Sequence, residues 1–322
     1  MMKDAIKNFH TQFAFVPKVI NPLPIRHPKR IIVAGMGGSH LAGDLLKVWN
    51  PKLDVYIHHD YGLPLLPEEE LKNSLIVASS YSGNTEETLD AFHEAQKNKL
   101  LTTVISTGGR LLELAKSSGV PYVELPETGI QPRMATGLGL KALFALLGET
   151  SALKELDALS RTLKPPDFES EGKKLATEMQ NFVPVIYASS RNALIAYNWK
   201  IKFNETGKIP AFSNTFPELN HNEMTGFDAK RPTKLLSERF FFITLEDEDD
   251  HPRNKKRMRI LEDLYKDRWL AVKRIEMKGD SFFHKIFSSL VLADWTAFYT
   301  AENYGVDPEQ VPMVEEFKKL MK

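Results

Sequence analysis

The chain has 322 residues and a hydrophobic content of 42%, so it can bury a sizeable core, and its length predicts two domains of ordinary size. Its 42 basic and 42 acidic residues leave no net charge, which excludes a global field that would draw the protein to nucleic acid or to an anionic membrane. The absence of cysteine excludes a disulfide framework and a thiolate zinc site, and it fits a reducing compartment.

The first residues, MMKDAIKNFHTQF, contain no apolar core of signal-peptide length, and no run in the chain approaches 18 uninterrupted apolar residues. We therefore expect a cytoplasmic protein without a membrane segment. From residue 30 onward, a short β-rich run, a turn of small residues and an amphipathic helix follow one another three times, at residues 30–49, 73–96 and 101–119. This alternation predicts a parallel sheet.

The same pattern returns in the second half of the chain. A helical stretch at about residues 141–181, interrupted by LKPPDFES, is followed by further strand–helix patterns at residues 183–203, 240–265 and 270–290. The chain is therefore predicted to be an α/β protein made of two related domains, residues 1–155 and residues 156–322. Each is expected to be a mainly parallel sheet flanked by helices.

The turns differ between the halves. In the first half, GMGGS follows one strand, SSYSGNT the next and STGG the third, so glycine amides and hydroxyl groups converge at the carboxyl ends of the strands, where open parallel sheets bind ligands. The second half has SSR, EDEDD and EMKGD at these places. One phosphate site is therefore predicted, in the N-terminal half.

Residues Gly38, Ser39, Ser80, Ser82 and Thr85 are the predicted phosphate-binding residues. Hydroxyl groups donate hydrogen bonds to phosphate oxygens, and the helix that starts near Thr85 adds free N–H groups and a positive dipole end. GMGGS alone is weak evidence, because it lacks the GxGxxG spacing and also suits a plain connection that lets a helix pack on the sheet. Serine and threonine are also ordinary helix caps, but two such turns in consecutive units favour phosphate binding.

Glu205 and His221 are candidates for acid–base catalysis. They lie in FNETGKIPAFSNTFPELNHNEMTGF, a long polar stretch without helical or strand periodicity, and such stretches inside compact domains are usually functional. A carboxylate can carry a proton between adjacent sugar carbons, and an imidazole can donate a proton to the ring oxygen when a cyclic sugar opens. The alternatives are a solvated carboxylate at a helix end and an ordinary loop histidine.

Several motifs together resemble a known family. GMGGS with SSYSGNTEET is similar to the phosphosugar-binding signature of sugar isomerase (SIS) domains, and the two-copy layout resembles the phosphoglucose isomerase superfamily. The segments QPR (131–133), KIKFNETGKIPAF (200–212) and FPELNHNEMTGF (216–227) resemble, more narrowly, the bifunctional phosphoglucose/phosphomannose isomerases. The similarity extends over nearly the whole chain, and it implies two SIS-type subdomains.

The resemblance implies a role for four residues. It makes Glu205 the base, His221 the ring-opening histidine, Arg133 the stabiliser of the enediolate, and Lys318 a lysine that assists ring opening, with Lys319 as the alternative. A guanidinium group suits the negative charge that develops on the enediolate oxygen. The alternative for Arg133 is an ordinary surface arginine without a catalytic role. Some members carry a threonine seven residues before the lysine, linked to acceptance of both epimeric sugars; here Val311 takes this place.

The implied function is that of an aldose–ketose isomerase. It would interconvert glucose 6-phosphate and/or mannose 6-phosphate with fructose 6-phosphate through a cis-enediol, without cofactor or metal, in a homodimer with shared active sites. The alternative is a non-catalytic phosphosugar-binding regulator; no basic helix-turn-helix module for such a role is visible, and an aminosugar-forming enzyme would call for a cysteine-dependent ammonia source. The charged run EDEDDHPRNKKRMR at residues 246–259 is expected to be a solvated turn and helix start.

Overall fold

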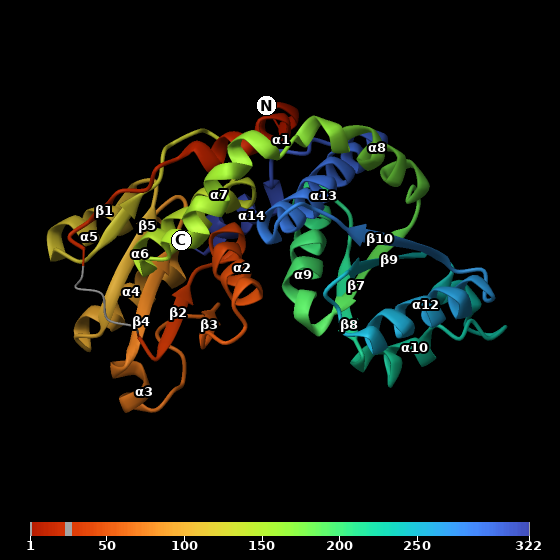
Figure 1. Cartoon of the computed structure of the whole chain (residues 1–322), viewed down its shortest axis with the longest axis horizontal. Coiled ribbons are helices and arrows are strands. Elements are labelled where there is room, and N and C mark those ends of the chain that lie inside the picture. Colours follow the sequence, from red (N-terminus) through yellow and green to blue (C-terminus); the bar gives the residue numbers. More distant parts are fainter. Residues whose placement is uncertain (1, 23–27, 322) are drawn as a thin grey trace. The chain divides into compact units, whose positions relative to one another are not determined.

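The computed structural model describes residues 2–22 and 28–321. The chain divides into two compact units, which we describe separately: an N-terminal unit, Asn8–Thr162, and a C-terminal unit, Leu163–Lys322 together with Met1–Lys7 (Figure 1). The predicted domain boundary at 155/156 lies inside one helix, α7 (Thr150–Thr162), and the division into units falls at the end of that helix.

The N-terminal unit contains a six-stranded sheet in the order β1-β6-β5-β4-β2-β3. All neighbouring pairs are parallel except β1 with β6. The central strand β4 is buried along its whole length, which explains its continuous apolar run. The strands are β1 (Val19–Ile20), β2 (Arg30–Ala34), β3 (Val55–His58), β4 (Ser74–Ser79), β5 (Leu101–Ser106) and β6 (Tyr122–Glu124).

The helices of this unit pack in two groups, α2 against α6 and α4 against α5. Each joins its sheet through an apolar face, such as Ala91, Phe92 and Ala95 of α4. The helices are α2 (Leu41–Trp49), α3 (Glu68–Lys72), α4 (Glu86–Lys97), α5 (Gly109–Ser118), α6 (Thr136–Leu147) and α7.

The C-terminal unit contains a four-stranded, wholly parallel sheet in the order β10-β9-β7-β8. Helix α13 packs against α8 and α9, and α12 lies on the other side of the sheet from α9 (Figure 1). The strands are β7 (Val183–Ser189), β8 (Phe212–Phe216), β9 (Phe240–Asp247) and β10 (Ala271–Met277). The helices are α1 (Met2–Lys7), α8 (Glu169–Glu178), α9 (Ala193–Lys202), α10 (Glu223–Gly226), α11 (Lys234–Ser237), α12 (Pro252–Lys266), α13 (Phe282–Tyr304) and α14 (Pro312–Leu320).

The structure confirms the fold class predicted from the strand–helix alternation: this is an α/β protein in which both sheets are mainly parallel and flanked by helices. None of the helices in the described part of the chain is long and apolar enough to span a membrane.

Candidate active site

The turn between β4 and α4 has the form of a phosphate cradle. The hydroxyl groups of Ser80 and Thr85 lie 2.8 Å apart, and the backbone N–H of Gly83 donates to Ser80 Oγ at 3.1 Å. Thr85 is the N-cap of α4, so its hydroxyl group stands beside the first free amides of that helix. Ser82 is exposed on the same turn. The structure therefore groups three of the predicted phosphate-binding residues at one helix start.

The GMGGS turn after β2 is joined directly to this cradle. Ser39 Oγ accepts a hydrogen bond from the backbone N–H of Tyr81 at 2.9 Å, and the Ser79 hydroxyl donates to the Ser39 carbonyl at 2.8 Å. Since β2 and β4 are neighbouring parallel strands, their carboxyl ends meet at one edge of the sheet. Gly38 and Ser39 therefore lie at the same edge of the sheet as the serines after β4.

Gly38 also brings the Arg133 segment to this edge. A methyl group built on Gly38 would lie 2.5 Å from the backbone N of Arg133 and 2.5 Å from the carbonyl carbon of Pro132, so no residue other than glycine permits this approach. Arg133 lies in a 3₁₀ turn, Pro132–Met134, and is only 2% exposed. The structure thus shows a buried arginine beside the cradle, where a surface arginine was the plain alternative.

A buried glutamine that the sequence analysis did not single out fixes the Arg133 segment. Gln12 Nε2 donates to the Met134 carbonyl at 2.7 Å, while Gln12 Oε1 accepts from the N–H groups of Gly137 and Leu138 at 3.1 and 3.3 Å. It thereby satisfies free amides at the start of α6. Because this contact joins residues more than 120 positions apart, no local pattern in the sequence could have revealed it.

A buried imidazole, that of His40, lies directly after the GMGGS turn and contacts the more exposed imidazole of His59. His40 Nδ1 lies 3.1 Å from Asp44 Oδ2, and the rings of His40 and His59 are 4.3 Å apart. Burial lowers the pKa of His59, and the neighbouring His40 lowers it further. His59 is therefore mostly neutral at pH 7.

In the C-terminal unit, Glu205 lies in a single turn of π-helix, Phe203–Gly207, which directly continues α9. Such turns occur frequently at functional sites, because the extra residue redirects a side chain. Glu205 is half-buried. Lys208 has a left-handed backbone conformation (φ 58°). Its ammonium group donates hydrogen bonds to the carbonyl oxygens of Glu205 and Gln310, and so connects the π-turn to the segment before α14.

His221 is exposed at the end of a short turn, Glu218–Asn220, in the same unit. Its backbone N–H donates to the Glu218 carbonyl at 2.9 Å, and two residues further on Glu223 begins α10. Glu205 and His221 thus occupy separate turns, both held by the C-terminal unit.

Lys318 and Lys319 are both exposed on α14. Lys318 forms an ion pair with Glu315 at 2.9 Å, one turn earlier on the helix. Val311 is the N-cap residue of α14 and follows Gln310, the residue held by Lys208.

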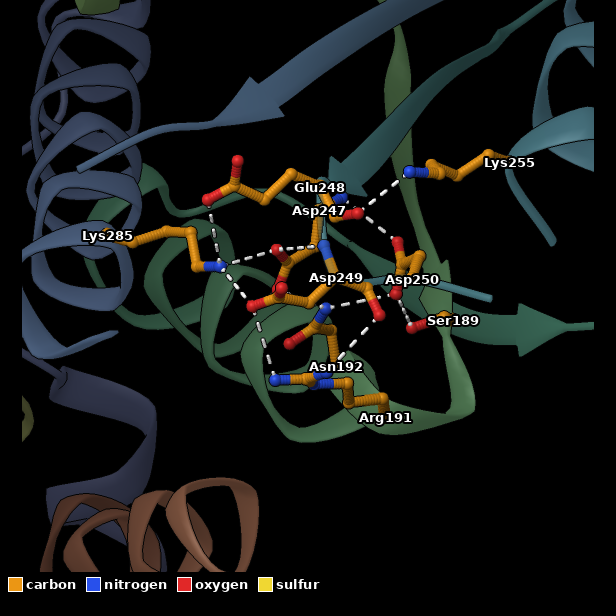
Figure 2. Close-up of polar contacts among 9 residues, drawn as sticks. All are labelled: Ser189, Arg191, Asn192, Asp247, Glu248, Asp249, Asp250, Lys255 and Lys285. Carbon is orange, nitrogen blue, oxygen red and sulfur yellow. Dashed lines mark hydrogen bonds and ion pairs between the residues drawn. The ribbon is translucent and has the colours of Figure 1, made fainter. Parts of the chain in front are cut away.

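The corresponding edge of the second sheet is filled by the protein's own charged groups (Figure 2). Ser189, at the end of β7, donates its hydroxyl hydrogen to Asp250, whose other carboxylate oxygen accepts from the backbone N–H of Asp247 at 3.0 Å. Lys285 of α13 contacts Asp247 at 2.6 Å and Asp249 at 2.9 Å. A carboxylate therefore already takes the hydrogen bonds that an anion would need beside Ser189.

This arrangement corrects the prediction that residues 246–259 begin with a solvated turn. Asp247 and Asp250 are 0% and 3% exposed, because Lys285 and Asn192 reach them from elsewhere in the unit; Asn192 Nδ2 lies 3.1 Å from Asp247. Burial raises the pKa of Asp250, whereas the hydrogen bond from Lys285 lowers the pKa of Asp249. No group of histidine and carboxylate side chains in residues 2–22 and 28–321 is placed to hold a metal ion.

Comparisons with known proteins agree with the motifs. Residues 168–321 match the model of the bacterial phospho-glucose isomerase C-terminal SIS domain. A bifunctional phosphoglucose/phosphomannose isomerase of Caldicellulosiruptor bescii is 36% identical over 91% of this chain and 89% of its own length. This chain belongs to the bifunctional phosphoglucose/phosphomannose isomerase family. Another relative of that name, from Aquifex aeolicus, is 32% identical over 98% of this chain and 97% of its own length.

The fold of this family member is also found in solved structures. A glucosamine-6-phosphate deaminase of Thermotoga maritima superposes with a TM-score of 0.68 over 97% of this chain and 96% of its own, at 16% identity. At that identity the likeness supports the fold and no more.

Proposed function

We propose that this isomerase interconverts glucose 6-phosphate and/or mannose 6-phosphate with fructose 6-phosphate through a cis-enediol. The observation that carries the proposal is the junction of the GMGGS turn, the SSYSGNT cradle and the Arg133 segment at one edge of the first sheet. A phosphate monoester needs the converging hydroxyls and amides, and an enediolate needs the guanidinium. The names of the relatives support the substrates.

Each proposed catalytic group has one task. His221 protonates the ring oxygen while Lys318 assists loss of the anomeric hydroxyl proton, so the sugar opens to its aldehyde. Glu205 then removes the proton from C2 and returns it to C1, and Arg133 stabilises the enediolate oxygen between these steps. Charge and atoms balance without an electron acceptor, so the reaction calls for neither cofactor nor metal.

The domain roles follow from this division of tasks. We assign the phosphate site to an N-terminal SIS domain, residues 1–155, and the acid–base loop to an SIS-like domain, residues 156–322. The cytoplasm is the proposed location, because a cysteine-free chain fits a reducing compartment.

The test is an assay of both aldose phosphates in the presence of a chelator, followed by the reaction in deuterated water. Isomerisation should place solvent deuterium in the sugar. Glu205→Gln keeps the shape of the side chain but removes the base, so turnover should fall about 10² to 10⁴-fold while substrate affinity survives.

A folded Glu205→Gln protein with near-normal turnover would end the base assignment. The alternative, a non-catalytic regulator, predicts binding without isomerisation in the wild type, and that result would replace the proposed function. The ratio of the two aldose activities tests acceptance of both epimers, which Val311 leaves open.

We also propose a homodimer in which His221 reaches the site of the partner subunit. The exposure of His221 supports this arrangement, because its imidazole is accessible to a second copy. Mixing Glu205→Gln with His221→Ala, which each retain only residual activity, should raise the activity above that of either variant, since a mixed dimer contains one site with both groups intact. Each variant mixed with itself is the control, and no recovery after demonstrated subunit exchange would exclude shared sites.

A further inference from the structure

The carboxylate of Glu223, two residues after His221, is held at both oxygens by side chains from the strands. The Tyr187 hydroxyl donates to Glu223 Oε1 at 2.5 Å, and the Asn214 amide donates to Oε2. Tyr187 lies in β7 and Asn214 in β8, which are paired in the sheet. The start of α10 is therefore tied to the rigid part of the C-terminal unit.

Tyr187 is itself immobilised. It is 0% exposed and packs in the core with Phe216, Phe242 and Tyr265; its ring centre lies 6.0 Å from that of Phe216 and 5.6 Å from that of Phe242. Burial raises the pKa of the Tyr187 hydroxyl, and nearby Tyr265 and Glu223 raise it further. The hydroxyl therefore remains a hydrogen-bond donor throughout the physiological pH range.

The turn is fixed on the other side of His221 as well. Leu219 is 0% exposed and belongs to the same core as Tyr187. Asn222 Nδ2 donates to Glu218 Oε1 at 2.7 Å, and the backbone N–H of Glu223 donates to Asn222 Oδ1 at 2.5 Å. Both anchors lie within two residues of His221, whereas its imidazole remains exposed.

We propose that Glu223 is a positioning residue for His221: Tyr187 and Asn214 fix its carboxylate, and the carboxylate fixes the backbone from which the imidazole projects. The inference rests on the proposed function, because it assumes that His221 opens the sugar ring. Glu223 is not itself the base, since both of its oxygens already accept hydrogen bonds. A small displacement of a catalytic group is enough to slow a reaction strongly.

The first experiment compares variants of Glu223. Glu223→Ala should lower kcat about 10²-fold with little change in KM, because the phosphate-binding turns are untouched. Glu223→Gln should retain more activity than Glu223→Ala, within about tenfold of the wild type, since its amide oxygen still accepts from Tyr187 while the hydrogen bond from Asn214 is lost. If Glu223 were the proton shuttle, Gln and Ala would be equally inactive, and that result would overturn the inference.

The second experiment removes only the donor. Tyr187→Phe should lower kcat about tenfold. Tyr304→Phe is the control: it also deletes a hydroxyl group, one that accepts a hydrogen bond from the backbone N–H of Asn181 at 2.7 Å, but it lies outside the His221 turn and should leave kcat unchanged. Equal losses of kcat in the two variants would contradict a specific role for Tyr187.

A double-mutant cycle separates positioning from a general structural effect. In a His221→Ala background, Glu223→Ala should cause no further loss of kcat, because its whole effect passes through the imidazole. If the wild type is an active isomerase and the losses of kcat from Glu223→Ala and His221→Ala are fully additive, the positioning role of Glu223 is overturned while the proposed function stands. A wild type that does not isomerise hexose phosphates overturns the proposed function and this assignment with it.

Discussion

At the scale of single residues, this site depends on close backbone approaches that only glycine allows. Gly38 lets the Pro132–Arg133 backbone reach the GMGGS turn. Gly83 has a φ of +70°, and a methyl group built on it would lie 1.9 Å from the carbonyl oxygen of Gly108. These glycines join turns that follow different strands. Packing excludes a side chain at both glycines, and at Gly83 the positive φ disfavours one as well.

Gly38→Ala should therefore reduce both stability and activity. The added methyl group meets backbone atoms at 2.5 Å, so the Arg133 turn must move, which lowers kcat and costs more than about 1 kcal/mol in the free energy of unfolding. Gly37→Ala is the matched control: it has a φ of +53° but nothing within 4 Å, so only backbone strain of about 1 kcal/mol is expected. Denaturant unfolding with parallel assays measures both effects, and equal kcat values would refute the close-approach argument.

Gln12→Ala should destabilise the N-terminal unit by about 2 to 4 kcal/mol. It leaves a buried carbonyl at Met134 and the amides of Gly137 and Leu138 without their side-chain partner. Gln12→Glu keeps an acceptor for the amides, but it sets a carboxylate oxygen against the Met134 carbonyl in place of the donor, so it should destabilise the unit as well. Thermal unfolding of the two variants measures the losses, and a Gln12→Ala protein as stable as the wild type would contradict the role of this contact.

At the scale of elements, α13 holds two neighbouring segments of the C-terminal unit through buried ion pairs, one of them next to the proposed base Glu205. Its Asp294 accepts from Lys202 at 2.6 Å, with both side chains at most 2% exposed, and Lys202 immediately precedes the π-turn of Glu205. Nearer its start, Lys285 holds the loop after β9. One helix thus fixes the loop after β9, at the carboxyl side of the second sheet, and the turn that leads into β8, at the opposite side of the sheet.

Asp294→Ala should cost about 3 to 5 kcal/mol, because it leaves the Lys202 ammonium group buried without this carboxylate. The double variant Lys202→Met, Asp294→Leu removes both charges and should recover most of the loss. Chemical denaturation of the single and double variants tests this, and a double variant no more stable than the single one would contradict the ion-pair explanation.

The Lys285 cluster should make stability depend on pH at both extremes. Burial alone would lower the pKa of Lys285, but its hydrogen bonds to Asp247 and Asp249 outweigh this and raise it above 10.5. Its contribution is therefore complete below pH 10.5 and is lost as the pH rises through the folded-state pKa. The pKa of Asp249 lies below 3.8, so its contribution is complete above pH 3.8 and is lost as the pH falls through the folded-state value.

Lys285→Met should flatten both limbs of the curve of unfolding free energy against pH. Exposed Lys256, on α12, provides the control variant Lys256→Met, which should leave the curve unchanged. Identical pH curves for wild type and Lys285→Met would show that the cluster adds nothing to stability.

At the scale of the whole molecule, the two mainly parallel sheets differ in the groups at their carboxyl edges. The first presents hydroxyls and amides, whereas the second fills its edge with Asp250, Asp247 and Lys285. Crystals soaked in phosphate should therefore show the anion between the turns after β2 and β4 and none beside Ser189. Density for an anion beside Ser189 alone would reverse the assignment.

The sequence by itself determined the strand–turn–helix order, the parallel sheets and the candidates Gly38, Ser39, Ser80 and Thr85. These features follow from apolar periodicity and from turn residues, which act over a few neighbouring positions. The tertiary structure alone decided the burial of Asp250, the contact of Gln12 with Met134 and the anchoring of Glu223 by Tyr187. Each of these depends on side chains at least 36 residues away, whose hydrogen bonds form only when the chain has packed and excluded water.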